Sequence, residues 1–281
     1  MKFLSICSGI EAASVAWNPI GFEAIGFSEI EPFCCELLRQ KYPSTPNFGD
    51  MTNHGRWQKF DRPEIIVGGT PCQSFSIAGL RKGLADPRGN LMLTYLEIVK
   101  CNQPRWVVWE NVPGVLSSNG GRDFGTFIGC LAEFGYHVSW RVLDASGFGV
   151  PQRRKRVFVV GYLGERTDSG KILFKPEGND GNKQKDKQRA ISPTLQTTCN
   201  DYSRADGFLI IESGKRYRRL TPIECERLQG FPDGYTAIPW RNKSASDCPD
   251  GPRYKALGNS MAVPVVRWIG ERIKMHDQGL L

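Results

Sequence analysis

Residues 65–72 read Ile65-Ile66-Val67-Gly68-Gly69-Thr70-Pro71-Cys72: a short β-branched run, two glycines and then a loop. A run of this kind predicts a buried strand that ends at the glycines. Further apolar runs along the first 160 residues predict more strands. They cover residues 3–7, 22–28, 105–109, 137–143 and 157–160.

Segments with helical character separate most of these strands. They cover residues 11–17, 31–41, 91–101 and 124–134. The second opens with Glu31-Pro32, which places proline near the first helical position, where it is tolerated best. Two more helices are predicted over residues 221–228 and 263–274. The alternation indicates an α/β fold with a doubly wound, mostly parallel sheet.

The composition narrows the class of protein. The chain has 281 residues, of which 40% are hydrophobic and 23% charged, as in ordinary globular proteins rather than fibrous or disordered ones. No apolar run is long enough to cross a membrane, and Glu11 follows too early for a signal peptide, so a cytoplasmic protein is expected. Nine cysteines without a CxxC pair, and three histidines, argue against a metal site or a disulfide framework.

The net charge is concentrated in one segment. Residues 151–219 hold 16 basic and 8 acidic side chains, which accounts for the whole formal charge of +8 (37 − 29). After Gly161 the strand and helix pattern also stops, which indicates a small irregular region. A localised basic excess favours a polyanion-binding face. A solvated lysine-rich loop around residues 183–187 is the equally simple alternative.

Polar residues follow four of the predicted strands. They are Cys7-Ser8-Gly9, Ser28-Glu29, the segment from Gly68 to Ser76, and Glu110-Asn111-Val112. Ligands bind at the carboxyl ends of parallel strands, so these segments should meet at one edge of the sheet. The dinucleotide fingerprint GxGxxG is absent, which disfavours a nicotinamide or flavin oxidoreductase.

Several of these residues suggest particular chemistry. Cys72 lies in a loop, where a thiolate can act as a nucleophile. Glu110 follows an apolar strand, and a desolvated surrounding would raise its pKa and let it donate a proton. Glu29 could accept hydrogen bonds from a ribose diol. Asp50, after a further potential strand, is either an acceptor for an exocyclic amino group or an ordinary turn residue.

At this point the sequence resembles the DNA (cytosine-5) methyltransferases over nearly its whole length, with the motifs in the usual order. The most specific match is Gly-Gly-Thr-Pro-Cys-Gln-Ser-Phe-Ser at residues 68–76, the nucleophile motif. The other matching segments are Cys7-Ser8-Gly9, Asp86 to Leu91, Glu110-Asn111-Val112, Gln152 to Arg156, Arg219 to Pro222, Gly230 to Pro232, and Gly258-Asn259-Ser260 with Val263-Pro264.

The resemblance implies roles for individual residues and S-adenosylmethionine as the methyl donor, without a metal. The implied catalytic residues are Cys72, Glu110, Arg154 and Arg156. The implied cofactor-binding residues are Ser8, Gly9, Glu29, Ile30, Asp50, Met51, Pro71, Leu91, Asn259 and Ser260. The implied DNA-binding residues are Ser76, Arg81, Lys82, Arg88, Gln152 and Thr194.

The resemblance also implies the domain organisation and the substrate. Residues 1–160 with 255–281 would bind the cofactor and catalyse the reaction, and residues 161–254, with a basic insertion at about 160–219, would recognise the target. The substrate would be a cytosine flipped out of double-stranded DNA, and the enzyme a monomer. A restriction-modification system, an orphan enzyme and phage self-protection all fit, and the target sequence does not follow from the chain.

The first motif departs from the family pattern. Cys7 stands where the family has a phenylalanine over the adenine, and Glu11 and Ala12 stand where it has paired glycines. Two alternatives remain open, the same chemistry on RNA and a catalytically silent DNA-binding protein. Amino-group DNA methyltransferases carry an Asp/Asn/Ser-Pro-Pro-aromatic motif, and this chain contains no such tetrapeptide.

Overall fold

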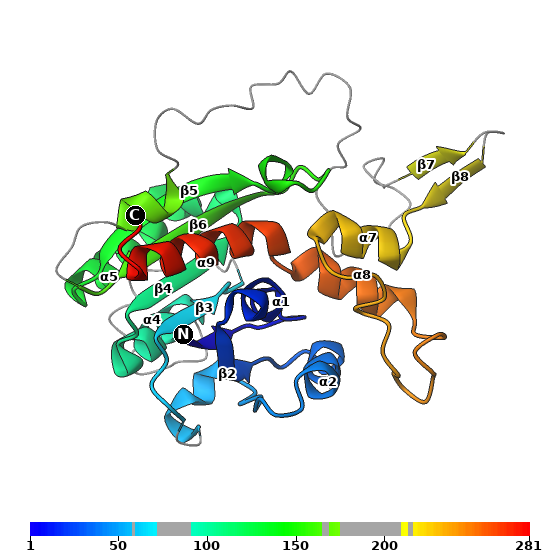
Figure 1. Cartoon of the computed structure of the whole chain (residues 1–281), viewed down its shortest axis with the longest axis horizontal. Coiled ribbons are helices and arrows are strands. Elements are labelled where there is room, and N and C mark those ends of the chain that lie inside the picture. Colours follow the sequence, from blue (N-terminus) through cyan, green and yellow to red (C-terminus); the bar gives the residue numbers. More distant parts are fainter. Residues whose placement is uncertain (58–59, 72–90, 165–168, 175–208, 213–215) are drawn as a thin grey trace.

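The computed structural model describes residues 1–57, 60–71, 91–164, 169–174, 209–212 and 216–281. In these ranges a six-stranded sheet lies between two layers of helices (Figure 1). Its strands are β1 (Lys2–Ile6), β2 (Glu23–Ser28), β3 (Ile65–Gly68), β4 (Trp106–Asn111), β5 (His137–Asp144) and β6 (Lys155–Tyr162). The predicted α/β fold is therefore confirmed, and each predicted strand lies within two residues of its expected bounds.

The strand order of the sheet is β2-β1-β3-β4-β6-β5, and β6 is its antiparallel strand. The strands from β2 to β4 pair in parallel, whereas β6 is antiparallel to both β4 and β5. Val157 pairs with Asn111 and Tyr162 with Trp106, so β6 begins where β4 ends. Residues at the start of β6 consequently reach the same edge as the carboxyl ends of the parallel strands.

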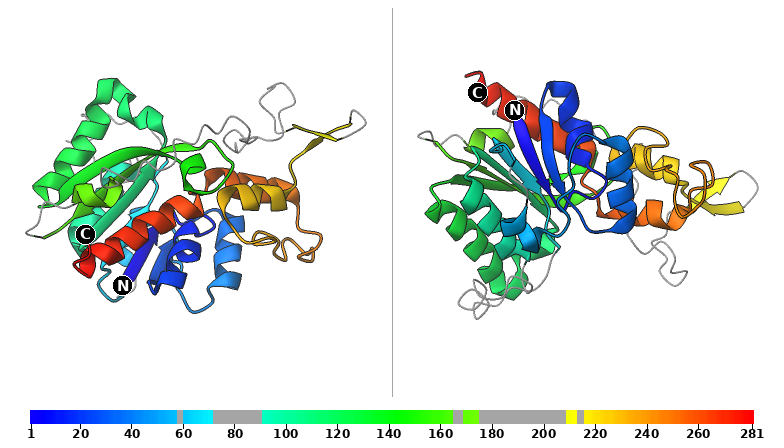
Figure 2. Two further views of the ribbon diagram at one scale, coloured as in Figure 1. Left: turned by 45° about the horizontal axis from the view of Figure 1, so that its top comes forward. Right: turned by 90° about the horizontal axis from the view of Figure 1, so that it is seen from below.

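Successive residues of the strands face opposite helical layers, as the period of two in a strand requires. Ile65 and Val67 belong to one hydrophobic cluster and Ile66 to the other. The first cluster includes α1 (Ala12–Trp17), α2 (Pro32–Lys41) and α9 (Val263–Asp277). The second includes α4 (Leu91–Asn102) and α5 (Arg122–Glu133), and Figure 2 shows these helices on the far side of the sheet from α1 and α9.

Local sequence explains where two of the helices begin. The carboxylate of Glu31 accepts hydrogen bonds from the first turn of α2, and Pro32 occupies the first helical position. Helix α7 (Pro222–Gln229) begins with a capping box between Thr221 and Glu224. Both helices start where the sequence predicted.

Some elements were not predicted. They are α8 (Asp250–Asn259), α6 (Ser169–Leu173), the hairpin of β7 (Leu209–Glu212) and β8 (Arg216–Arg219), and the 3₁₀ helices η1 (Asn18–Ile20), η2 (Met51–Arg56), η4 (Pro113–Leu116), η5 (Ser118–Gly121) and η6 (Ala145–Phe148). The potential strand before Asp50 is reduced to one parallel bridge between Phe27 and Asn47. Pro46 has no N–H to donate, so the chain there cannot continue a ladder.

Helices α7 and α8 contribute to the first hydrophobic cluster. Cys225, Leu228 and Leu257 belong to the same buried cluster as residues of α1 and α9. Within the predicted target-recognition region (161–254), residues 165–168, 175–208 and 213–215 lie outside the described residues, so the domain division remains a prediction. None of the helices in the described ranges is both long enough and apolar enough to cross a membrane.

Candidate active site

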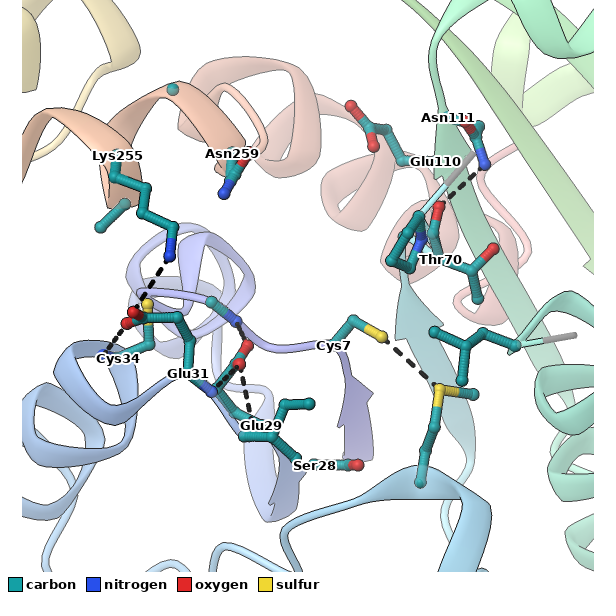
Figure 3. A pocket seen from close by; sticks show the side chains of 18 of the residues that line it. Cys7, Ser28, Glu29, Glu31, Cys34, Thr70, Glu110, Asn111, Lys255 and Asn259 are labelled. Atoms are coloured by element: carbon teal, nitrogen blue, oxygen red, sulfur yellow. Dashed lines mark hydrogen bonds and ion pairs between the residues drawn. The ribbon is translucent and has the colours of Figure 1, made fainter. Parts of the chain in front are cut away.

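A cavity of about 480 Å³ opens at the carboxyl ends of the strands. All four strand ends predicted to meet contribute to its wall, and α8 closes one side (Figure 3). The residues that line it are Cys7, Gly9, Ser28, Glu29, Ile30, Glu31, Cys34, Gly49, Asp50, Met51, Gly69, Thr70, Pro71, Leu91, Glu110, Asn111, Val112, Arg154, Arg156, Lys255, Ala256, Gly258 and Asn259. Its size is typical of a small-molecule site.

Backbone N–H groups fix the carboxylate of Glu29 at the cavity wall. Its Oε2 accepts a hydrogen bond from Gly9 N at 2.7 Å, and its Oε1 accepts from Ile30 N at 2.8 Å and Glu31 N at 2.7 Å. These three contacts join the loop after β1 to the end of β2. Among the described residues, the carboxylate is therefore held in one position by backbone N–H groups and not by a basic side chain.

The loop after β1 contains three residues in the left-handed region, with φ of 52° at Cys7, 56° at Gly9 and 62° at Glu11. This conformation favours glycine, so two of the three positions adopt it with a side chain in place. Cys7 Sγ lies 3.5 Å from Met51 Sδ. Burial raises the pKa of the Cys7 thiol to about 12, so this cysteine is a thiol at neutral pH and a poor nucleophile.

Glu11 has a structural task that explains its position. Its side chain is fully buried, and its Oε1 accepts from Ser14 N at 3.0 Å and from Ser14 Oγ at 3.1 Å, which caps α1. Its Oε2 has no partner among the described residues. Burial raises the pKa of this carboxyl to about 7, against the opposing effect of the hydrogen bonds from serine.

Asp50, Ile30 and Asn259 also line the cavity. Asp50 Oδ1 accepts from Thr52 N at 2.9 Å and so caps η2. The side chain of Ile30 is 68% exposed, unusually high for a large apolar residue beside a cavity. Asn259 is the last residue of α8, and Figure 3 shows its side chain directed into the open space. The cavity wall therefore includes a carboxylate, an amide and an exposed apolar side chain.

The loop after β3 is held by residues of β4. Asn111 Nδ2 donates to Thr70 O at 3.0 Å, and Trp109 Nε1 donates to Thr70 Oγ1 at 3.2 Å. A Cβ on Gly69 would lie 2.9 Å from Glu110 Oε2, so only glycine fits at this position without a shift. These contacts fix Pro71, the residue that precedes Cys72, at the cavity wall.

Glu110 and two arginines form the opposite part of the wall. Arg156 Nε lies 3.0 Å from Glu110 Oε1. Burial raises the pKa of Glu110, although Arg156 and Arg154 oppose the shift. This direction agrees with the sequence-based expectation. The result is a carboxyl group that can hold a proton while it faces a cavity.

Arg154 is buried and anchored by backbone carbonyls. One of its terminal nitrogens donates to Gly258 O at 2.9 Å and Ser260 O at 2.7 Å. Its Nε and Nη1 have no partner among the described residues. Burial lowers the pKa of Arg154 to about 10, with Arg156 adding to the effect, so the guanidinium stays charged at neutral pH. It can therefore offer donors to a ligand.

Some of the predicted site residues lie elsewhere. Ser8 and Ser260 do not line the cavity: the Ser8 hydroxyl donates to Ser5 O at 2.9 Å, and that of Ser260 to Met261 O at 3.2 Å. Gln152 is fully buried and does not line the cavity, whereas Arg154 and Arg156 do. The remaining predicted residues, Cys72, Ser76, Arg81, Lys82, Arg88 and Thr194, lie outside the described residues.

The structure also adds residues that were not predicted. Thr70 and Asn111 stand inside quoted motifs, so their neighbours in the sequence could have identified them. Lys255 and Glu31 line the cavity with opposite charges. Lys255 lies on α8, an element that was not predicted, so its place at the cavity did not follow from the sequence.

An α/β sheet with these strand ends around one cavity is the fold of the S-adenosylmethionine-dependent methyltransferases. The Dnmt2 methyltransferase of S. pombe has the same fold, with a TM-score of 0.75 and 20% identity over 99% of both chains. The methyltransferase EhMeth of Entamoeba histolytica superimposes with a TM-score of 0.69 and 16% identity over 99% of this chain and 98% of its own.

Within this fold the chain belongs to the C-5 cytosine-specific DNA methylase family, whose model matches residues 1–206 and 165–275. Type II methyltransferase M.SsoII of Shigella sonnei is 30% identical over 97% of this chain and 79% of its own length. A protein of Escherichia phage P1 named DNA N-6-adenine-methyltransferase is 31% identical over 96% of this chain, which spans 60% of that protein.

Proposed function

We propose that the protein transfers a methyl group from S-adenosylmethionine to C5 of a flipped-out cytosine in double-stranded DNA, through a covalent bond between Cys72 and C6. The proposal rests mainly on the cavity, which brings together two groups of residues with different chemistry. The cofactor end consists of Gly9, Glu29, Asp50 and Asn259, and the base end of Glu110, Arg154 and Arg156. Pro71, directly before Cys72, lies on the same wall.

The cofactor end fits an adenosyl ligand. Glu29 would accept hydrogen bonds from the ribose diol, Asp50 from the exocyclic amino group of adenine, and Ile30 would cover a face of the ring. When bound, S-adenosylmethionine supplies a methyl group activated by a sulfonium. Gly9 would bring the backbone close to the ligand, since it has no side chain to fill the space.

The base end fits a pyrimidine whose charge changes during the reaction. The Cys72 thiolate would add to C6, which breaks the aromaticity and makes C5 nucleophilic. Glu110, with its raised pKa, would donate a proton or hydrogen bond to N3 as negative charge builds there, and the donors of Arg154 and Arg156 would hold O2. After C5 accepts the methyl group, its proton leaves to a base and the C6–S bond breaks to release the thiolate.

A cytosine inside a duplex cannot reach this cavity, so the base must leave the stack at a cost of roughly a few kcal/mol. The basic excess of residues 151–219 would hold the phosphates. Contacts from Ser76, Arg81, Lys82, Arg88 and Thr194 remain proposals from the sequence.

The proposal is tested with a duplex that carries 5-fluorocytosine. With fluorine in place of the C5 hydrogen, no proton can be removed from C5 after methyl transfer, so the C6–S bond cannot break and the enzyme should remain covalently attached in the presence of S-adenosylmethionine. We expect a shifted band on a denaturing gel for the wild type and none for Cys72→Ala. An adduct of equal yield from Cys72→Ala would reject the nucleophile.

Analysis of nucleosides from methylated DNA distinguishes the chemistry. Radiolabelled methyl groups should appear in 5-methylcytosine. Label in N6-methyladenine, the product suggested by the name of the phage P1 relative, would reject the reaction. Label on RNA in preference to duplex DNA would reject the substrate.

A further inference from the structure

Two charged side chains of the cavity have no part in the proposed function. Lys255 Nζ lies 3.2 Å from Glu31 Oε1, and both residues line the cavity. Lys255 belongs to α8, and Glu31 caps the start of α2. Figure 3 shows the pair on the wall that also carries Asn259 and Glu29. The pair therefore closes the cofactor end of the cavity between two helices.

Lys255 faces the cavity for a geometric reason. It precedes Asn259 by four residues on α8, which places both side chains on one face of the helix. An ammonium group has three N–H donors, and Glu31 uses one of them. Among the described residues this ammonium has no other partner. It can therefore donate to a second anion while it keeps its bond to Glu31.

Glu31 is held in place by the backbone. Its Oε2 accepts from Phe33 N at 2.9 Å and Cys34 N at 3.3 Å. Its own N–H donates to Glu29 Oε1 at 2.7 Å. The remaining oxygen, Oε1, faces Lys255 beside the carboxylate proposed to bind the ribose. Glu31 is consequently a fixed anion one residue beyond the proposed adenosyl contacts of Glu29 and Ile30.

The cofactor of the proposed function has one further pair of charges, the carboxylate and the ammonium of its amino-acid end. The other carboxylates of the cavity already have tasks, since Glu29 and Asp50 accept from backbone N–H groups and Glu110 pairs with Arg156. We infer that Lys255 and Glu31 form the subsite for this amino-acid end, with Lys255 donating to its carboxylate and Glu31 accepting from its ammonium. The inference rests on the proposed function.

The simplest competing role is a tether between α8 and α2. Both side chains are partly exposed, and ion pairs of that kind contribute little to stability. A tether would influence every adenosyl ligand alike, whereas a subsite discriminates between ligands that have the carboxylate and ligands that lack it. The two roles can therefore be separated by a thermodynamic cycle. One side of the cycle removes the ammonium of Lys255, and the other removes the carboxylate of the ligand.

The experiment measures the Kd values of S-adenosylmethionine and its decarboxylated form by calorimetry for the wild type and Lys255→Met. Methionine keeps the length and apolar stem of lysine and removes the charge. We expect Lys255→Met to weaken S-adenosylmethionine by roughly tenfold or more, the effect of a lost charge-assisted hydrogen bond, and the decarboxylated form by less than twofold. Glu31→Gln, which keeps the cap of α2, should weaken both ligands because both retain the ammonium.

Arg39→Met is the matched control, because Arg39 lies on α2 as an exposed partner of Glu36 outside the cavity. It should leave both Kd values unchanged. Equal weakening of both ligands by Lys255→Met would overturn the subsite in favour of the tether, and unchanged Kd values would overturn it as well. If the wild type bound neither ligand, the proposed function itself would fail.

Discussion

At the proposed cofactor end of the cavity, the carboxylates of Glu29 and Asp50 accept hydrogen bonds from backbone N–H groups. At the base end, Glu110 is buried beside Arg156, and its pKa is raised. The same kind of group is thus held in two ways. Backbone donors fix a carboxylate as an acceptor for hydroxyl or amino groups, whereas burial favours the protonated form that can donate.

The largest effect is expected from Glu110→Gln at the base end. An amide keeps the shape of the side chain but has no proton to transfer, so kcat should fall about 100- to 10,000-fold. The Kd of S-adenosylmethionine should change less than twofold, because the cofactor end is untouched. Single-turnover methylation and calorimetry check the two values. Glu133→Gln, on the exposed side of α5, is the control. A loss of cofactor affinity equal to the loss in kcat would show that the two ends do not act separately.

Arg156→Met should reduce kcat by roughly 100- to 1,000-fold, the usual effect of removing a donor to a developing charge. It should also change the pH dependence. Arg156 lowers the pKa of Glu110 against the effect of burial, so its loss raises that pKa further. If activity requires protonated Glu110, the alkaline limb of the kcat profile shifts to higher pH in the variant. A limb that stays in place would contradict the assignment of Glu110 as the proton donor.

Glu29→Ala should act on binding alone. Lost charge-assisted hydrogen bonds correspond to about 1.5–3 kcal/mol, or a roughly 10- to 150-fold weaker Kd for S-adenosylmethionine. At saturating cofactor, kcat should remain within about threefold of the wild type. Calorimetry and initial rates measure the two quantities. An unchanged Kd would reject the role of Glu29, and a collapse of kcat at saturation would show that the two ends are coupled.

The smallest effect concerns Glu11, behind the cofactor end. Its folded-state pKa of about 7 lies above the ordinary value of 4.5, so the stability it contributes is complete at low pH and is lost as pH rises through 7. Glu11→Gln keeps an oxygen for the cap and removes the titration. Relative to the wild type, the variant should gain roughly 1 kcal/mol of unfolding free energy between pH 6 and pH 8. Urea unfolding at both values tests this, with exposed Glu23→Gln as the control. A constant difference would show that Glu11 does not titrate in this range.

Much of the fold was predictable because the strands are short apolar runs that end in glycine or polar residues. Helix α8 was not, since Asp250–Asn259 contains two glycines and a proline and little apolar periodicity. Tertiary contacts support it instead: Arg253 pairs with buried Glu226 at 3.2 Å, and Gln229 Nε2 donates to Leu257 O at 2.9 Å. Contacts of this kind leave no periodic signal in the sequence.

The sequence predicted which strand ends meet at the candidate site, but not every residue that joins them there. Glu110, Arg154 and Arg156 meet because β6 is antiparallel to β4, which the order of elements alone did not reveal. Gln152 belongs to the same matched segment as the two arginines but does not line the cavity, a difference that the sequence of residues 152–156 does not reveal. Glutamate ordinarily avoids the left-handed region, so the sequence did not predict that backbone conformation at Glu11.

The reversed direction of β6 has a consequence for how this chain can diversify. The strand leaves the cavity edge after Arg154 and ends eight residues later at Tyr162, roughly 26 Å away, where Leu163 N donates to Arg105 O at 2.9 Å. Gly164, the last described residue before Ser169, therefore lies near the margin of the sheet opposite the arginines. If the segment after Gly164 recognises the target, as the resemblance implies, it can be exchanged there without moving the arginines, and the target preference can change while the cavity stays the same.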